Sequence, residues 1–188
     1  MISTLLTIVI PCKDSVYELK STIENIAKQT RISSTKILVL DMGSKDGSFQ
    51  YADQASLEHS RILKIESINY NPRKIHELMN SISTFYTMVV LPGTNFKSND
   101  FILDQVNDIL SNEKILLFSQ GNKIIDRIFP NKRLKEGKIK ITSALSSKNY
   151  FNSSEFIEEN GKMSILIDKG IIDKDIKIIG GKLFYSSK

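Results

Sequence analysis

The sequence predicts an α/β protein, a three-layer sandwich in which helices cover both faces of a mostly parallel central sheet. Over the first 110 residues, short apolar runs rich in β-branched residues alternate with amphipathic stretches of helical period. Strands that alternate with helices at this spacing are joined by right-handed parallel crossovers. At 188 residues the chain is long enough to bury a core and has the length of a single domain.

Five short apolar runs are predicted to form the first strands. Leu5–Ile10 is apolar throughout, as expected of a strand buried on both faces, and Pro11 should end it. The other four are Lys36–Leu40, Arg61–Glu66, Thr87–Leu91 and Ile115–Ser119.

The stretches between these strands carry helix signals. Ser15 and Glu18 have the spacing of a capping box and precede an apolar face of helical period. That face is formed by Val16, Leu19, Ile23 and Ile26. A second helix is expected from about Ser48 to Leu57, with Phe49, Ala52 and Ala55 facing inward. A third has Asn71 as its N-cap and Pro72 in its first turn, and buries Ile75, Leu78, Met79 and Ile82.

The remainder of the chain is less regular. A helix should begin at Ser98 or Asn99, and a short helix is expected over Ser153–Asn160. The serine- and asparagine-rich stretch Ser143–Ser154 indicates loops at the edge of a mixed sheet. Short β-like runs occur at Lys138–Thr142, Ile176–Ile179 and Lys182–Tyr185.

Composition excludes several classes of function. No apolar run approaches the roughly 20 residues of a membrane-spanning helix, and the start lacks signal-peptide features, so we expect a cytoplasmic protein. A single cysteine and two histidines argue against an internal disulfide and a zinc site. The net charge of +5 suits an anionic ligand or membrane face. The densest basic cluster lacks stacking aromatics, so no nucleic-acid partner is expected.

The stretch Lys36–Ser48, KILVLDMGSKDGS, is the strongest candidate for a binding site. An apolar strand ends in Asp41 and then in a turn that contains Gly43 and Gly47. Open α/β sheets bind ligands at such strand ends, and glycine lets a ligand approach the main chain. The alternative is an ordinary corner between a strand and a helix.

The chain resembles the family 2 glycosyltransferases. TIVIPCKDSVYELKSTIENIAKQT and KILVLDMGSKDGS are similar to the family's opening strand, proline, helix and Asp-Asp-Gly-Ser turn. NYNPRKIHELMNSISTFYTMVVLPGTNF is similar to the helix and strand that lead to the family's metal-binding loop. The resemblance implies a GT-A-like, Rossmann-like fold over residues 1–188. Residues 1–120 would form a nucleotide-binding half and residues 121–188 an irregular acceptor-side half.

The resemblance also implies a set of substrate-binding residues. Asp41 matches the acid that contacts the base, and Arg73 is one of several cations, with Lys13, Lys74 and Lys97, that could act on a diphosphate. The full set is Pro11, Cys12, Asp14, Asp41, Gly43, Ser44, Arg73, Thr94 and Asn95. From the residues alone, Asp41 could instead bond its own turn, Asp14 could cap a helix and Cys12 could be a packed residue.

Several acids of the family pattern are replaced. Met42 stands where a second acid is usual, and Pro92 and Thr94 stand in place of an Asp-x-Asp motif. Because those acids hold Mg²⁺ or Mn²⁺, no residue is assigned as a metal ligand and no cofactor is certain, although an unconventionally held Mg²⁺ or Mn²⁺ could still act. Glu159 is the candidate general base, followed by Asn160 where the family often has an acid. Other late acids, each also explained as a surface residue, are Glu158, Asp168, Asp173 and Asp175.

Two functions follow as hypotheses. The first is a glycosyltransferase that moves a sugar from a nucleotide diphosphate to a glycan or lipid-linked acceptor in surface polysaccharide synthesis, at the inner membrane face. The second is a catalytically inactive GT-A-like domain that acts as a nucleotide-binding subunit or as the partner of another glycosyltransferase subunit. A flavodoxin-like or nucleotidyltransferase α/β domain is a third class.

Overall fold

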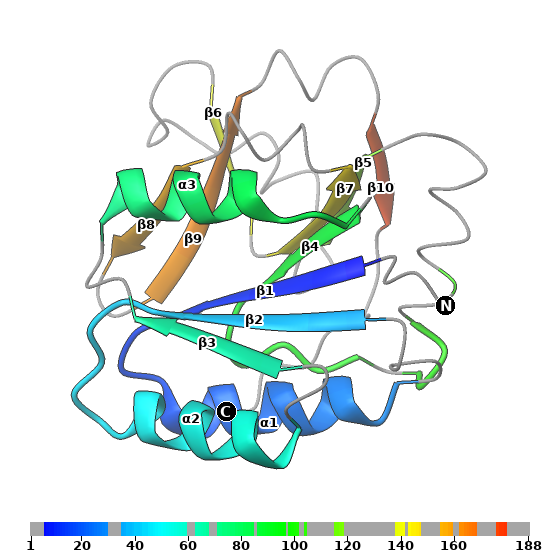
Figure 1. Ribbon diagram of the computed structural model, residues 1–188. Helices are drawn as coiled ribbons and strands as arrows, with labels where there is room; N and C mark the ends of the chain where they lie inside the picture. Colours follow the sequence, from blue (N-terminus) through cyan, green and yellow to red (C-terminus); the bar gives the residue numbers. More distant parts are fainter. Residues whose placement is uncertain are drawn as a thin grey trace.

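The computed structural model describes a mixed α/β architecture over most of the chain (Figure 1). The described residues are 6–29, 35–59, 63–67, 71–84, 86–96, 98–101, 104, 115–118, 138–141, 143–147, 155–159, 162–168 and 176–179. Their helices are α1 (Val16–Ala27), α2 (Ser48–Glu58) and α3 (Pro72–Ser81). Their strands are β1 (Leu6–Cys12), β2 (Thr35–Asp41), β3 (Leu63–Ser67), β4 (Tyr86–Val90), β5 (Ile115–Phe118), β6 (Lys138–Ile141), β7 (Ser143–Ser147), β8 (Glu155–Glu159), β9 (Lys162–Asp168) and β10 (Ile176–Ile179).

The main sheet has the strand order β10-β5-β7-β4-β1-β2-β3, and β6, β9 and β8 form a separate antiparallel sheet. β1 pairs in parallel with both β2 and β4, β2 pairs in parallel with β3, and β10 pairs in parallel with β5. α1 and α2 cover one face of the main sheet and α3 lies on the other (Figure 1). The predicted three-layer sandwich with a mostly parallel sheet is therefore confirmed.

β1 lies at the centre of this arrangement because its sequence is apolar on both faces. All seven of its residues are buried, and Ile8, Val9 and Ile10 are fully enclosed. Alternate residues belong to a core cluster with Leu19 and Ile23 of α1. The remaining residues of β1 point to the opposite face of the sheet, which α3 covers, because side chains alternate along a strand.

The prediction that Pro11 ends β1 is wrong. The strand continues to Cys12, with Pro11 opposite Leu40 of β2. The carbonyl of Cys12 accepts a hydrogen bond from the Met42 N–H on the β2 side, so the backbone of Pro11 faces the β4 side. Pairing between β1 and β4 ends at Val9, and the missing N–H of the proline therefore costs no ladder bond.

Of two predictions for the later part of the chain, one is confirmed in part and one is wrong. The stretch expected to form a mixed sheet edge and loops contains β7, which makes the sheet mixed but lies inside it, antiparallel to both β4 and β5. The helix expected over Ser153–Asn160 is replaced by β8, which pairs with β9. Pairing with a neighbouring strand satisfies the backbone of this glutamate-rich segment and overrides its weak local preference.

The cap of α3 and the first turn of the predicted fourth helix agree with the sequence-based predictions. The side chain of Asn71 accepts hydrogen bonds from the N–H groups of Arg73 and Lys74, as predicted for the cap of α3. After β4, the N–H of Asp104 donates to the carbonyl of Asp100 at the start of the predicted fourth helix. The rest of that helix and the predicted strand Lys182–Tyr185 lie outside the described residues. In the described part of the chain, no helix combines the length and apolar character needed to cross a bilayer.

The chain that leaves β4 runs along α1 and is hydrogen-bonded to its polar side. We call residues 93–96 and Ser98 the strap. The Asn25 side chain donates to the carbonyl of Phe96 and accepts from its N–H, at 3.3 and 2.7 Å. Gln29 donates to the carbonyl of Ser98 at 3.0 Å. Nearer the strand ends, Thr22 and Ser21 bond Thr94 and Asn95. Helical spacing places these α1 residues on one side, so α1 has an apolar face toward the sheet and a polar face toward the strap.

The strap makes a testable contribution to stability. Asn25→Ala removes both hydrogen bonds to Phe96 and should lower the free energy of unfolding by about 1 to 2 kcal/mol. The corresponding fall in melting temperature is about 2 to 8 °C, measurable by calorimetry. Glu24→Ala, at the exposed neighbouring position, is the matched control and should change stability by less than about 0.5 kcal/mol. Equal melting temperatures for the two variants would contradict this role of the strap.

Candidate functional site

The carboxyl ends of β1 and β2 bring two loops together. Parallel pairing sets Cys12 opposite Asp41, so the loop from β1 to α1 and the loop from β2 to α2 leave the same edge of the sheet. These loops hold most of the residues that the sequence singled out. In open α/β sheets this edge is where ligands bind.

The two loops are joined by hydrogen bonds in both directions. The Asp14 N–H donates to the Ser44 hydroxyl at 3.1 Å, and the Asp14 carboxylate accepts from the Lys45 N–H at 2.6 Å. The Val16 N–H donates to the Asp46 carboxylate at 2.8 Å. We call this set of contacts the loop clamp. A fourth contact belongs to it, in which the Ser15 N–H donates to the Ser48 hydroxyl at 3.0 Å.

The loop clamp replaces the predicted capping box of α1. Ser15 is the N-cap residue, but its side chain makes no capping hydrogen bond, and its buried hydroxyl has no partner among the described residues. The carboxylate of Asp46, thirty residues away, accepts from the first helical N–H instead. The capping-box prediction is therefore wrong, because an acid on a neighbouring loop reaches the helix start.

Backbone conformation at the loop clamp is unusual at three positions. Asp14 has φ +44°, in the left-handed region that non-glycine residues seldom adopt. Aspartate tolerates this region better than most residues, and the two bonds of Asp14 to the second loop offset the cost. Gly43 and Gly47 also have positive φ, so the glycines of the turn have a conformational role.

Asp41 is directed into its own turn. Its side chain is only 2% exposed, and its carboxylate accepts from the N–H groups of Gly43 and Ser44 at 3.2 to 3.4 Å. The Cys12 sulfur lies 4.0 Å from the same carboxylate. This is the geometry of a turn acid bonded to its own backbone. Met42, which replaces the second acid of the family pattern, is buried in the core.

Burial, together with the carboxylates of this edge, keeps the Cys12 thiol protonated by raising its pKa. Burial raises the pKa of the thiol from 9.0 to about 12, and the negative charges of Asp41, Asp46 and Asp14 add to the increase. A hydrogen bond with Ser44 acts in the opposite direction. The thiol is therefore protonated and unreactive at neutral pH.

Asp46 behaves differently because it is hydrogen-bonded as an anion. Partial burial acts to raise its pKa, but bonds from the Ser48 hydroxyl and from the N–H groups of Val16 and Ser48 outweigh it. The net result is a pKa below the ordinary 3.8. Asp46 is thus charged at neutral pH and holds the start of α1.

The segment after β4 offers poor ligands for a metal. Thr94 is 2% exposed and its carbonyl accepts from the Thr22 hydroxyl at 3.1 Å. The amide oxygen of Asn95 accepts from the Ser21 hydroxyl at 3.0 Å. Pro92 and Gly93 have no side-chain oxygen, and the described residues contain no group of three His, Cys, Asp or Glu side chains suited to a metal ion. Mg²⁺ and Mn²⁺ need several oxygen ligands, usually including carboxylates, and this donor set does not fit them.

The structure thus gathers part of the predicted set. Pro11, Cys12, Asp14, Asp41, Gly43 and Ser44 lie together at the ends of β1 and β2. Thr94 and Asn95 belong to the strap. Arg73 is on α3, 89% exposed and 3.3 Å from Glu77. Glu159 ends β8 in the separate sheet, opposite Lys162.

The residues that hold the loops in place were not predicted. Asp46 was expected only as part of the turn and Ser48 only as the start of a helix, and no contact was predicted for the polar residues that form a stripe along α1. The Asp-Gly-Ser sequence, which contains common capping residues, was the available signal for Asp46. The spacing of Thr22, Asn25 and Gln29 was the signal for the stripe.

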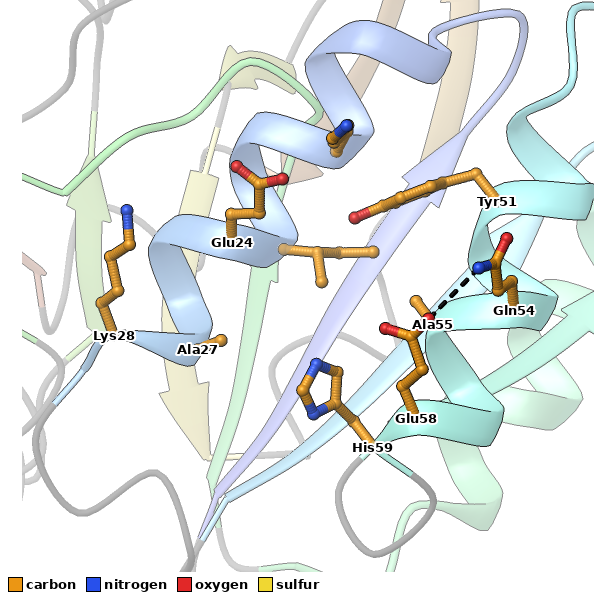
Figure 2. A pocket seen from close by; sticks show the side chains of 10 residues that line it. Glu24, Ala27, Lys28, Tyr51, Gln54, Ala55, Glu58 and His59 are labelled. Atoms are coloured by element: carbon orange, nitrogen blue, oxygen red, sulfur yellow. Dashed lines mark hydrogen bonds between the residues drawn. The ribbon is translucent and has the colours of Figure 1, made fainter.

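A separate groove of about 580 Å³ lies between α1 and α2 (Figure 2). Ile23, Ala27 and Ala55 contribute apolar surface, and Tyr51 projects across the groove toward α1. Burial raises the pKa of Tyr51, and the charges of Glu24 and Glu58 add to this effect. The residues that line the groove come from α1, α2 and the residue after each helix, and none belongs to the loop clamp. The groove is therefore distinct from the strand-end site.

Glycosyltransferases are among the solved structures that this fold resembles. Mannosyltransferase PcManGT from Pyrobaculum calidifontis, in complex with GDP-Man and Mn²⁺, aligns with a TM-score of 0.68 at 11% identity, covering 95% of this chain and 55% of that one. Residues 1–349 of S. aureus TarS with UDP-GlcNAc align at 0.65 and 12% identity, covering 96% and 57%. The chain has a GT-A-type glycosyltransferase fold.

A third glycosyltransferase extends the comparison. Glucosyl-3-phosphoglycerate synthase from Mycobacterium tuberculosis, with Mg²⁺ and UDP, aligns at 0.54 and 13% identity, covering 80% of this chain and 58% of that one. The GT-A-type chain spans little more than half the length of these structures. No protein-family model matches it, and no curated protein matches it significantly in sequence. At such low identity the likeness shows the fold alone.

The lowered pKa of Asp46 predicts a pH-dependent contribution to stability. Since the folded-state pKa lies below the ordinary value, the contribution is present above about pH 4 and is lost as the pH falls through the folded-state pKa. Near pH 7, Asp46→Asn should lower the free energy of unfolding by about 0.5 to 1 kcal/mol, as for an exposed capping group. Chemical denaturation of both proteins between pH 7 and about pH 2 checks this. A difference that persists unchanged in acid would contradict the capping role.

The buried thiol gives a second prediction. Because Cys12 is the single cysteine of the chain, a thiol reagent reports on it alone. At pH 8 the folded protein should react at least about a hundredfold more slowly than the protein in denaturant. The rate of colour release from a disulfide reagent measures this ratio. Equal rates in the two states would show that the thiol is accessible and ionised.

Proposed function

We propose that this chain is a glycosyltransferase domain that binds a nucleotide sugar at the ends of β1 and β2. The sugar would pass to a hydroxyl of a glycan or lipid-linked acceptor, in the synthesis of a surface polysaccharide. The loop clamp is the observation that carries the proposal, because it fixes two loops at the edge where open α/β sheets bind ligands. Support also comes from similar folds that contain GDP-Man and UDP-GlcNAc.

Most of the predicted residues have a role in this proposal. Pro11 and Cys12, both buried, end the strand beneath the nucleotide, and Gly43 and Ser44 form the turn that faces it. Asp41 is the acid assigned to the base; its carboxylate is buried and bonded to Gly43 and Ser44, so the base has to displace one of these bonds to reach it. Arg73 supplies positive charge. Glu159 is the general base that takes the proton of the acceptor hydroxyl.

A second candidate function is favoured by the strap. A catalytically inactive domain that binds a nucleotide, or that partners an active glycosyltransferase, needs no metal at the leaving diphosphate. The segment after β4 contains no carboxylate at Pro92–Asn95, and its oxygens at Thr94 and Asn95 are bonded to α1. Cleavage of a bound donor distinguishes the two functions, because the inactive domain would bind the donor and leave it intact.

Nucleotide binding is the first test. We expect one base to raise the melting temperature and to bind in calorimetry, in a panel of UDP, GDP, dTDP and CMP with their sugar conjugates. Asp41→Asn should weaken that binding about tenfold to a hundredfold, the effect of one charge-assisted hydrogen bond. Asp53→Asn, an exposed acid on α2, is the matched control and should bind as the unmodified chain does. Unchanged affinity in Asp41→Asn would refute the base contact, and silence across the panel would refute the proposed function.

A further inference from the structure

The groups at the strand-end site differ in what they offer to the nucleoside and to the diphosphate of a nucleotide sugar. This inference rests on the proposed function and concerns which part of the nucleotide sugar supplies the affinity. In many nucleotide sites, backbone N–H groups, cations or a metal ion hold the phosphates. The described contacts of the strap and of the loop clamp indicate whether backbone N–H groups, cations or a metal ion could hold the phosphates here.

Backbone donors of the strap are already engaged. The Gly93 N–H donates to the carbonyl of Glu18 at 3.2 Å and to the hydroxyl of Thr22 at 3.0 Å. The Phe96 N–H donates to Asn25 at 2.7 Å. A phosphate at this segment would have to displace α1 from these amides. The segment likewise lacks the carboxylates that a divalent cation would need.

The charge of the loop clamp also opposes a diphosphate. Asp14, Asp41 and Asp46 lie on the two joined loops, and all three negative charges act on the buried Cys12. Lys13 and Lys45 are the cations of the same two loops, so the loops carry a net charge of about −1 by formal count. A diphosphate brought to this edge meets acids on both loops.

The same acids suit a nucleoside. Ribose hydroxyls and base N–H groups are neutral donors, and a carboxylate has about four lone-pair positions for accepting hydrogen bonds. The Asp14 carboxylate is exposed and accepts a hydrogen bond from the Lys45 N–H. Its left-handed backbone is fixed by the loop clamp, so the carboxylate is held in place before a ligand arrives.

We propose that this site binds a nucleotide sugar through its nucleoside, and that the diphosphate adds no affinity with or without a divalent cation. In this respect the chain differs from a site built around a metal-bound diphosphate. The strap occupies the place that the resemblance assigns to the metal-binding loop. Its hydrogen bonds stabilise α1 and occupy the Gly93 and Phe96 N–H groups, and the exposed Arg73 on α3 is paired with Glu77, so neither is a dedicated partner of the phosphates.

Calorimetric competition tests the proposal. Adenosine, cytidine, guanosine, thymidine and uridine are compared with their 5′-diphosphates, each in EDTA and in Mn²⁺. For the base that binds, we expect dissociation constants of nucleoside and diphosphate to agree within about threefold and to be unchanged by Mn²⁺.

Each other outcome overturns the proposal in a different way. A diphosphate that binds about tenfold tighter in EDTA would show that protein cations hold the phosphates. A tenfold tightening that appears only with Mn²⁺ would show a metal site, and the proposed function would stand in both cases. No binding of any compound would refute the proposed function together with this inference.

A variant that removes one negative charge tests the charge argument, because a purely structural role of Asp14 would not change the preference between diphosphate and nucleoside. Asp14→Asn keeps an oxygen for the Lys45 N–H and removes one negative charge. It should weaken the nucleoside and shift the ratio of the two affinities about twofold to threefold toward the diphosphate at low salt. The shift should shrink as salt is added. Asp53→Asn is the control and should change neither ligand. An unchanged preference in Asp14→Asn, in a protein with an unchanged melting temperature, would overturn the charge argument.

Discussion

The strand-end site depends on the enclosure of β1 between β2 and β4. Because β1 is buried on both faces and paired on both sides, it cannot shift by a residue without turning Ile8 and Ile10 away from the α1 core. The register with β2 sets Cys12 beside Asp41, and that position brings the two following loops into contact. The hydrophobic pattern of a seven-residue strand therefore determines where the polar groups of the site meet.

α1 connects this edge of the sheet to the segment that follows β4. Its apolar face packs on the sheet, its first N–H is capped by Asp46, and its polar stripe holds the strap. One helix thus stabilises the loop clamp and also fixes the segment after β4. The hydrogen bonds that order the strap also occupy its oxygens and amides. A group of the strap that stabilises α1 in this way is therefore not available to bind a phosphate.

How much of the structure could be predicted from the sequence depends on how far apart the interacting residues lie along the chain. Strands β1 to β4 and helices α1 to α3 could be predicted because hydrophobic period is a local signal, and the Asn71 cap because its partners lie two and three residues away. The Asp46 cap and the bonds of the strap could not, because their partners are 30 to 74 residues apart. The strands β7 and β8 were missed for the same reason, since pairing with distant strands decides them. Asp41 was placed correctly at a strand end, but the direction of its carboxylate depends on the turn conformation.

The strap has a consequence for the order in which the chain folds. Its hydrogen bonds join residues that lie 69 to 74 positions apart along the chain. Before each bond can form, the intervening chain must close into a long loop and lose conformational entropy. Contacts of this separation slow folding relative to helix formation, which is local. During synthesis, α1 leaves the ribosome well before the strap exists, and its polar stripe is bonded to water until residue 98 follows. The amino-terminal helix is therefore among the first elements to be made and among the last to be completed.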